Sequence, residues 1–283
     1  MQLNLIKLDD KIRFIIIFIS LGILFSFFFP FQLSSSTNSD DSNLSDSLKK
    51  QYLDDAARLA IIQMNQDSIL KTEIFVPDSL LYKYYEALIA VYNSDIKNTE
   101  IVKTIHEACS SEIKEFSLTI DSSASWVEDW RNGNKITGIN KLDDLITTYN
   151  IKLHDNQIFF DYYESLKKRL DDLKATHNTD INNIVDSYQL VIKTEDYVNY
   201  EIFPTLFHGI DKIRNVEPCR MIGDGDRISG SINNGSIILT YRTGWGDCPA
   251  GCLNRHYWKF SVNQNEVRLI REYGASLPIN NKT

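Results

Sequence analysis

Residues 244–258 read GWGDCPAGCLNRHYW and lie between two aromatic, β-prone runs of the chain. Two cysteines, three glycines and a proline in so short a stretch are typical of a tight turn with a fixed backbone shape. Strand-forming runs at 237–241, 257–262 and 267–272 are separated by Gly and Asn turns. The sequence therefore predicts that residues 223–283 form a β-meander that carries the cysteine loop.

A targeting segment lies at the N-terminus. Residues 14–31 contain no charged side chain and are mostly Ile, Leu and Phe. An apolar run of this length fits either a signal peptide within residues 1–36 or an uncleaved membrane anchor, and both predict export. The mature protein is then either membrane-anchored by this segment or secreted or periplasmic. Residues 37–48 are rich in Ser, Asn and Asp, so a flexible linker is expected there.

Four cysteines in an exported chain indicate disulfide bonds. The favoured pairing joins Cys248 to Cys252, because a proline and a glycine bend the short loop between them, and it joins Cys109 to Cys219. A redox-active pair and a metal site are the alternatives for the two cysteines of the loop. Their C-x-x-x-C spacing differs from the C-x-x-C of thioredoxin-like motifs, which favours the structural disulfide.

The composition bears on partners and chemistry. The chain has 38 Asp and Glu against 30 Lys and Arg, a net charge of −8, and this acidity disfavours nucleic acid as a partner. The sequence contains no hydrolase elbow, HExxH motif, Walker loop or dinucleotide fingerprint. We therefore expect no cofactor, and a protein or another envelope ligand as the partner.

Residues 49–112 are predicted to form a helical region that packs on the main domain. Within it, residues 50–65 carry apolar side chains at helical spacing. The same spacing puts Asp54 and Asp55 on the opposite, polar face of this helix. The pattern is that of an amphipathic helix with one side against a core.

Residues 77–93 predict a second amphipathic helix that begins at a proline. Residues 101–108 alternate between apolar and polar side chains, which predicts a strand. Two tryptophans, Trp126 and Trp130, follow in a stretch rich in polar residues and glycine, and that stretch predicts a loop.

Residues 113–222 predict a ferredoxin-like α+β unit. The expected order is strand, helix, strand, a helical insertion over 159–186, strand, a helix over 198–210, and strand. Without the insertion this order is βαββαβ, the arrangement that places helices on one face of an antiparallel sheet. The predicted fold class is therefore α+β, with the meander following the ferredoxin-like sheet.

Several segments together carry a family resemblance: residues 85–93 (YEALIAVYN), residues 142–145 (LDDL) with Tyr149, residues 223–225 (GDG) and residues 244–258. They are similar to a family of exported bacterial proteins of unknown function that share a GWGDCPAGC…RHYW motif near the C-terminus. The resemblance covers roughly residues 53–275. It implies export and a shared fold, and it brings no known activity. The cysteines outside the loop are not part of this pattern.

A second, fainter resemblance concerns residues 206–210 (LFHGI) and 216–218 (VEP). They are similar to the last helix and strand of subtilisin-type propeptides and their inhibitor relatives, which are also ferredoxin-like. A propeptide-like protease inhibitor is what this resemblance implies as a function. No protease domain follows these residues in the chain, and a likeness of fold is not a function.

Side chains in and beside the cysteine loop form a candidate recognition patch. Tyr, Trp and Arg are enriched in binding hot spots. The candidate binding residues are Trp245, Asp247, Arg255, His256 and Tyr257. Strand alternation places Tyr257 and Lys259 on one face of the sheet, and Trp258 and Phe260 on the other.

The same loop carries an alternative chemical interpretation. An envelope enzyme, or a thiol or metal site, would be built from Asp247, Cys248, Cys252, Arg255 and His256. Zinc needs four close ligands, and this set only just supplies them.

Two acidic residues before the meander, Asp224 and Asp226, resemble a fragment of a calcium loop. The full pattern needs further acidic ligands and a distal Glu, which the sequence does not supply, so a tight turn is the favoured interpretation. The sequence as a whole predicts an exported, non-enzymatic binding or structural module with a disulfide-stabilised aromatic loop.

Overall fold

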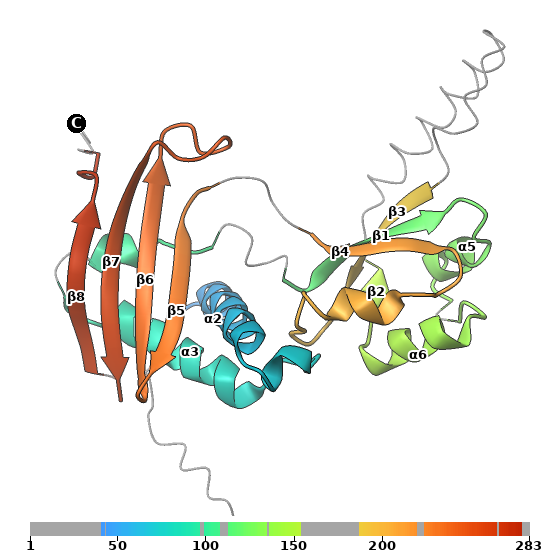
Figure 1. Ribbon diagram of the computed structural model, residues 1–283, viewed down its shortest axis with the longest axis horizontal. Helices are drawn as coiled ribbons and strands as arrows, with labels where there is room; N and C mark the ends of the chain where they lie inside the picture. Colours follow the sequence, from blue (N-terminus) through green and yellow to red (C-terminus); the bar gives the residue numbers. More distant parts are fainter. Residues whose placement is uncertain are drawn as a thin grey trace, which may run out of the picture. The chain divides into compact units, whose positions relative to one another are not determined.

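The computed structural model describes residues 41–42, 44–96, 99–107, 113–134, 136–153, 187–219, 224–264 and 266–278. These residues form an α+β structure with N-terminal helices and two four-stranded antiparallel sheets (Figure 1). The predicted signal or anchor segment and the predicted insertion over 159–186 lie outside them. No helix in the described part of the chain is long and apolar enough to span a membrane.

The helices and strands have the following bounds. The α-helices are α2 (Asp46–Gln66), α3 (Asp78–Tyr92), α4 (Thr99–Val102), α5 (Trp126–Arg131) and α6 (Asn140–Thr148). Two 3-10 helices are η1 (Leu70–Thr72) and η3 (Phe203–Phe207). The strands are β1 (Glu115–Asp121), β2 (Lys152–Leu153), β3 (Ser187–Lys193), β4 (Ile213–Pro218), β5 (Arg227–Asn233), β6 (Ser236–Trp245), β7 (Asn254–Asn263) and β8 (Glu266–Gly274).

Helix α2 begins earlier than the sequence pattern predicts. Ser45 is its N-cap and accepts a hydrogen bond from the backbone N–H of Leu48, 3.3 Å away. Leu44, just before the cap, is buried in the core. The prediction that residues 37–48 are all flexible linker is therefore wrong for the last residues of that range. A capping serine and a preceding apolar anchor fix the start of the helix.

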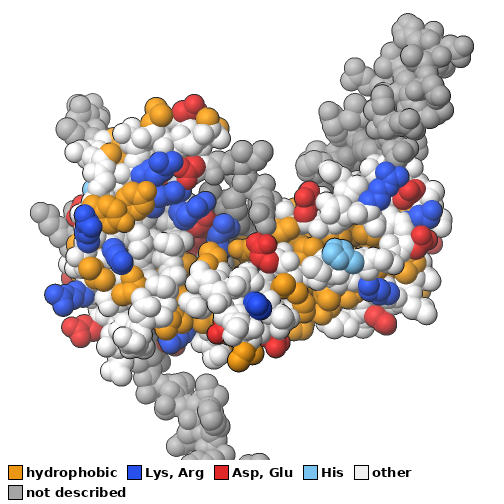
Figure 2. Space-filling model, viewed as in Figure 1, with side chains coloured by type: hydrophobic (Ala, Val, Ile, Leu, Met, Phe, Trp, Pro, Cys, Tyr) orange, Lys and Arg blue, Asp and Glu red, His pale blue; other side chains and the backbone are white. Residues whose placement is uncertain are grey.

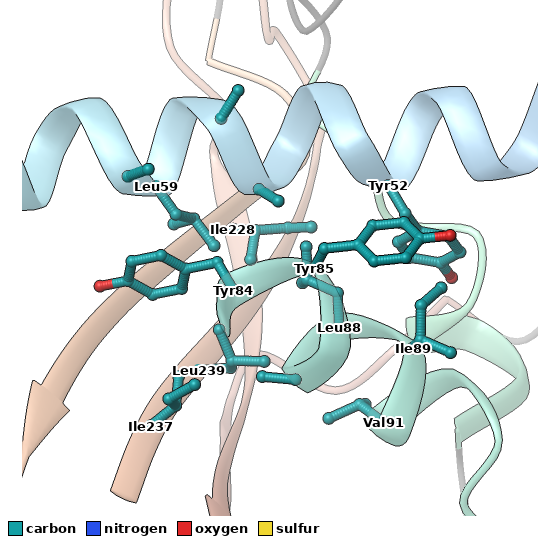
Figure 3. Close-up of a cluster of buried hydrophobic side chains, with 14 of the residues drawn as sticks. Tyr52, Leu59, Tyr84, Tyr85, Leu88, Ile89, Val91, Ile228, Ile237 and Leu239 are labelled. Atoms are coloured by element: carbon teal, nitrogen blue, oxygen red, sulfur yellow. The ribbon is translucent and has the colours of Figure 1, made fainter. Parts of the chain in front are cut away.

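Helices α2 and α3 cover one face of the sheet ordered β5-β6-β7-β8 (Figure 1). Figure 3 shows Tyr84 and Leu88 of α3 packed between α2 and the strands. Gly230 on β5 permits this close packing, because a Cβ atom there would lie 2.8 Å from the Tyr84 ring. Three strands of the predicted meander are confirmed, and β5 is the strand that the sequence pattern missed.

The other sheet has the order β2-β3-β1-β4, with every neighbouring pair antiparallel. Helices α5 and α6 pack on it, and together they bury a second hydrophobic cluster. Trp126 and Trp130 lie in α5 and are 6% and 4% exposed, so the predicted polar loop is wrong here. The helix predicted over 198–210 is wrong in extent, because only the short 3-10 helix η3 forms there.

The strand predicted over 101–108 is wrong. Residues up to Val102 close the short helix α4, and the backbone N–H of Ile105 then bonds to the carbonyl of Val102 at 3.1 Å. Val102 and Ile105 are both buried, and their spacing of three residues matches a helical turn rather than a strand. Alternating side chains over a short segment also fit a turn, so periodicity alone misleads there.

Candidate functional site around the cysteine loop

The structure places Cys248 and Cys252 at disulfide distance from each other, in the pairing that the sequence predicts. The two Cα atoms lie 3.9 Å apart, and the bond closes the turn between β6 and β7. Inside the loop the backbone N–H of Gly251 bonds to the carbonyl of Cys248 at 3.2 Å. Cys219 lies just after β4, and Cys109 lies outside the described residues, so their pairing stays a prediction.

Two glycines make room for this loop. Gly251 has a φ of 119°, a backbone conformation that residues with side chains rarely adopt. Gly244 on β6 is needed for a different reason, because a Cβ atom there would lie 2.5 Å from Sγ of Cys252. The disulfide therefore rests directly against the backbone of β6. This contact fixes the position of the loop relative to the sheet.

Asp224 ties the loop to the sheet through both its backbone and its side chain. Its backbone N–H donates a hydrogen bond to the carbonyl of Cys248 at 3.0 Å. Its carboxylate accepts hydrogen bonds from Arg242 on β6 and from Arg255 on β7, including one from Nε of Arg255 at 2.9 Å. Arg242 also donates to the carbonyl of Gly225 at 2.9 Å. We call Asp224, Arg242 and Arg255 the arginine clasp.

The contacts of Asp224 and Asp226 argue against a calcium site at this turn. The carboxylate of Asp224 is occupied by two guanidinium groups, and that of Asp226 accepts a hydrogen bond from the hydroxyl of Thr243 at 2.7 Å. The two acidic side chains therefore have separate partners. Among the described residues, no group of three or more His, Cys, Asp or Glu side chains is arranged to hold a metal ion. An arginine pair suits an anion rather than a cation.

The arginine clasp makes the stability of the folded state depend on pH. The hydrogen bond from Arg255 lowers the pKa of Asp224 below its usual value of 3.8, and Arg242 adds to this effect. The stabilisation from ionised Asp224 is thus complete above pH 3.8 and is lost as the pH falls toward the lowered folded-state pKa. We expect the melting temperature of the wild type to fall more steeply below pH 4 than that of Asp224→Asn.

Thermal unfolding of both proteins between pH 2 and pH 7 measures this difference. Asp226→Asn is the matched control, since Asp226 contacts a neutral hydroxyl rather than an arginine. Parallel curves for the wild type and Asp224→Asn would show that the clasp does not stabilise the folded state.

The candidate binding residues on β7 lie on two different faces of the sheet. Trp258 and Phe260 are fully buried against the helices, as alternation predicts. His256 lies on that same inner face and is 8% exposed. Its Nδ1 lies 2.7 Å from the carbonyl oxygen of Ala275, and its Nε2 lies 3.1 Å from Oε1 of Glu272. These two oxygens lie beside the ring, one at each nitrogen.

Arg255 and Tyr257 lie on the other, solvent face of the sheet. The Tyr257 ring stacks on that of Tyr273 across the strands, with centroids 4.8 Å apart and planes 8° apart. The guanidinium of Arg271 lies 4.8 Å from the centroid of Tyr273. The structure therefore brings Arg255 and Tyr257 to one surface and separates His256 from both.

The remaining members of the predicted patch lie at the loop itself. Trp245 is half-buried at the end of β6, opposite Asn254 of β7. Asp247 is exposed in the loop. Sequence reasoning missed Arg242 and Tyr273 as parts of the site. Only the register of the three strands places them beside Arg255 and Tyr257, and no spacing along the chain encodes that register.

A second polar cluster lies under the helices and was also missed. Asp55 on α2 is 1% exposed and accepts hydrogen bonds from Nδ1 of His106 at 2.7 Å and from the backbone N–H of Glu107 at 3.0 Å. Burial raises the pKa of Asp55, and the hydrogen bond from His106 opposes that rise. The prediction that Asp54 and Asp55 lie on a solvent face is wrong.

Glu107 extends this cluster to the edge of the sheet. Its carboxylate accepts a hydrogen bond from the backbone N–H of Ile228 on β5 at 3.2 Å. Arg58 and Arg227 lie within ion-pair distance of the same carboxylate, at 3.4 and 3.3 Å. Buried carboxylates in this arrangement join helix α2, the segment after α4, and strand β5. Such a network has a structural role that needs no ligand.

No protein-family model, no curated protein and no solved structure matches this chain. The family resemblance read from the sequence therefore stays a prediction, and the functional argument depends on the geometry of the site.

Proposed function

We propose that this protein is an exported, non-enzymatic binding module that recognises an envelope ligand through the solvent face of β6–β8 beside the cysteine loop. The arginine clasp is the observation that carries this proposal. Asp224 fixes Arg242 and Arg255 in place while a disulfide braces the adjacent loop. A guanidinium group has five N–H donors, and Arg255, whose side chain is 37% exposed, keeps donors beyond those bound to Asp224 for a ligand.

Pre-organisation supports binding as the role of this surface. A ligand loses less free energy on binding when the side chains that contact it are already held in one geometry. The disulfide, the glycine contact at β6 and the stack of Tyr257 on Tyr273 all limit motion here. Disulfides persist in oxidising compartments, which agrees with export through residues 14–31.

The fold of the other sheet is part of the proposal. We infer that residues 113–222 are a ferredoxin-like unit, because the order β2-β3-β1-β4 is the one that a βαββαβ chain gives when its helices cover one face. Helix α6 connects β1 to β2 in this unit. The unit has a hydrophobic cluster of its own, and the candidate binding residues lie outside it.

A photo-reactive amino acid at Tyr273 tests the binding surface in intact exporting cells. We expect it to form an adduct with a second molecule, and we expect Arg255→Ala to remove that adduct. Tyr82 on α3 is the control position, since it is 51% exposed against 37% for Tyr273. An adduct at Tyr273 in preference to Tyr82 then reports binding rather than exposure. Equal adducts at both positions, or an adduct that Arg255→Ala leaves unchanged, would contradict the proposal.

A further inference from the structure

The solvent face of the second sheet concentrates positive charge on an acidic protein. The whole chain has a net charge of −8. Figure 2 shows Lys and Arg side chains gathered over the strands β5–β8, with hydrophobic side chains between them. We call this surface the basic face. Its cations and tyrosines are Arg242, Arg255, Tyr257, Lys259, Arg268, Arg271 and Tyr273. The acidic Glu266 lies on the same face at its far end, opposite Asn263.

The register of the strands defines this face. Lys259 on β7 lies opposite Arg271 on β8, and Ser261 lies opposite Arg268. Side chains of directly opposed residues lie on the same face of a sheet. The neighbours Trp258 and Phe260 are buried on the inner face, so these opposed pairs point to solvent.

The pairing of Lys259 with Arg271 is unfavourable for folding. Like charges directly opposite one another on neighbouring strands destabilise a sheet. Among the described residues, no ion pair neutralises Lys259, Arg268 or Arg271, whereas Asp224 neutralises the clasp arginines at the other end of the face. A local arrangement that opposes folding marks a site kept for function.

The dimensions of the basic face exclude a single small anion as its full ligand. Arg255 and Lys259 are four residues apart on β7, which corresponds to about 13 Å along the strand. The cations also spread over three strands spaced about 5 Å apart. One carboxylate or phosphate contacts only one end of such a surface. A linear polyanion contacts all of it.

The groups between the cations indicate the kind of polyanion. Residues directly opposite one another on neighbouring strands form rows across the sheet. The row through Lys259 includes the hydroxyls of Thr240 and Ser229. The row through Arg268 includes those of Ser261 and Ser231. Hydroxyls both donate and accept hydrogen bonds, and sugar hydroxyls do the same. A polymer with one charge per sugar and hydroxyls between the charges matches this alternation of cations and hydroxyls.

The arrangement of the two tyrosines argues against single-stranded nucleic acid as the ligand of the basic face. Proteins bind unpaired bases by stacking them on open aromatic faces. Tyr257 and Tyr273 cover one face of each other, and Arg271 lies over the Tyr273 ring. Their rings therefore hold the arginine in place instead of offering a stacking platform. Their hydroxyl groups add donors to the face.

We propose that the basic face binds a linear polysaccharide that carries carboxylate groups. This inference rests on the proposed binding function and names the chemistry of the ligand. The polymer runs across β7 and β8, its carboxylates lie against Lys259, Arg268 and Arg271, and its hydroxyls lie against the Ser and Thr rows. The arginine clasp binds one end of the same chain.

Binding of labelled polygalacturonate to the full-length protein, measured by fluorescence anisotropy, tests this inference. We expect the affinity to fall with added salt and to rise with oligomer length up to a span of about 13 Å. Lys259→Gln with Arg271→Gln should weaken binding about tenfold and reduce the salt slope by roughly one for each cation removed. The same double variant should unfold at an equal or higher denaturant concentration, because it relieves like-charge repulsion.

The control variant is Lys71→Gln with Lys212→Gln, which removes two exposed positive charges from other elements. It should bind polygalacturonate as the wild type does. Dextran, a single-stranded DNA oligonucleotide, polyglutamate and anionic lipid vesicles are the comparison probes. Equal or tighter binding to any of them, or equal weakening by the control variant, would overturn the polysaccharide assignment.

The two proposals fail in distinguishable ways. An adduct at Tyr273 in cells, together with no binding of polygalacturonate, would overturn the polysaccharide chemistry and leave the binding function standing. The absence of both would overturn both. If the double variant Lys259→Gln with Arg271→Gln bound polygalacturonate as the wild type does, the ligand would lie elsewhere on the molecule.

Discussion

Replacement of Asp55 by alanine should lower the free energy of unfolding by about 2–5 kcal/mol, because it removes the buried acceptor that two donors share, and each buried donor left without a partner costs about 1–3 kcal/mol. Asp55 is 1% exposed and accepts hydrogen bonds from His106 and from the backbone N–H of Glu107. Without the carboxylate, the His106 ring and that N–H group lose their acceptor inside the protein. Urea unfolding followed by tryptophan fluorescence measures the change.

Glu73→Ala is the matched control for this experiment. Glu73 is exposed just after η1, so the loss of its carboxylate should change the free energy of unfolding by less than about 0.5 kcal/mol. His106→Ala should fall between the two, since it leaves the buried carboxylate with the Glu107 N–H as a remaining partner. A loss below about 1 kcal/mol for Asp55→Ala would show that water reaches this cluster and replaces the lost acceptor.

Replacement of Trp258 by alanine should have an effect of similar size for a different reason. Trp258 is fully buried between the sheet and the helices, and its ring contacts His256 with centroids 4.5 Å apart. Removal of a large buried aromatic side chain leaves a cavity and lowers the free energy of unfolding by about 3–5 kcal/mol. Urea unfolding again measures the change.

The neighbouring residue provides the control on the same strand. Tyr257→Ala removes a stacked pair on the solvent face and should change the free energy of unfolding by only about 0.5–1.5 kcal/mol. The same variant should lose the in-cell adduct at Tyr273. If Tyr257→Ala destabilised the protein more than Trp258→Ala, the assignment of the two faces of β7 would be reversed.

Local patterns in the sequence identify much of the binding sheet. Alternation along β7 separates Trp258 and Phe260 from Tyr257 and Lys259, and the burial of these residues confirms it. The short C-x-x-x-C loop pairs with itself, as its proline and glycine suggest. Both features depend on residues close together in the chain, so the sequence contains the information that decides them.

Other features depend on partners that are distant in sequence. Helical spacing places Asp54 and Asp55 with solvent, yet the hydroxyl of Tyr197 donates to Asp54 at 2.7 Å, and His106 holds Asp55. Those partners follow in the chain by 143 and 51 residues. Helical periodicity cannot predict that a polar side chain is buried by a contact with a residue so distant in sequence. The basic face likewise depends on strand register, which joins residues that are far apart in the chain.

The two hydrophobic clusters determine the order in which this chain becomes able to fold. The larger cluster joins α2 and α3 to strands β5–β8, which are the last elements of the sequence. All buried members of the smaller cluster lie between Phe116 and Ile210, so the first sheet is complete while the helices still lack their partner. Closing so long a loop is slow compared with local folding.

Helix α3 ends at Tyr92 and β6 begins at Ser236. During synthesis, the apolar sides of α2 and α3 therefore stay uncovered for roughly 10–20 s at ordinary translation rates, until β6 and β7 have been made. Exposed apolar surface on a nascent chain is prone to aggregate. The nested order of the elements therefore predicts that newly made chains aggregate unless their first helices are shielded until the last strands have been made.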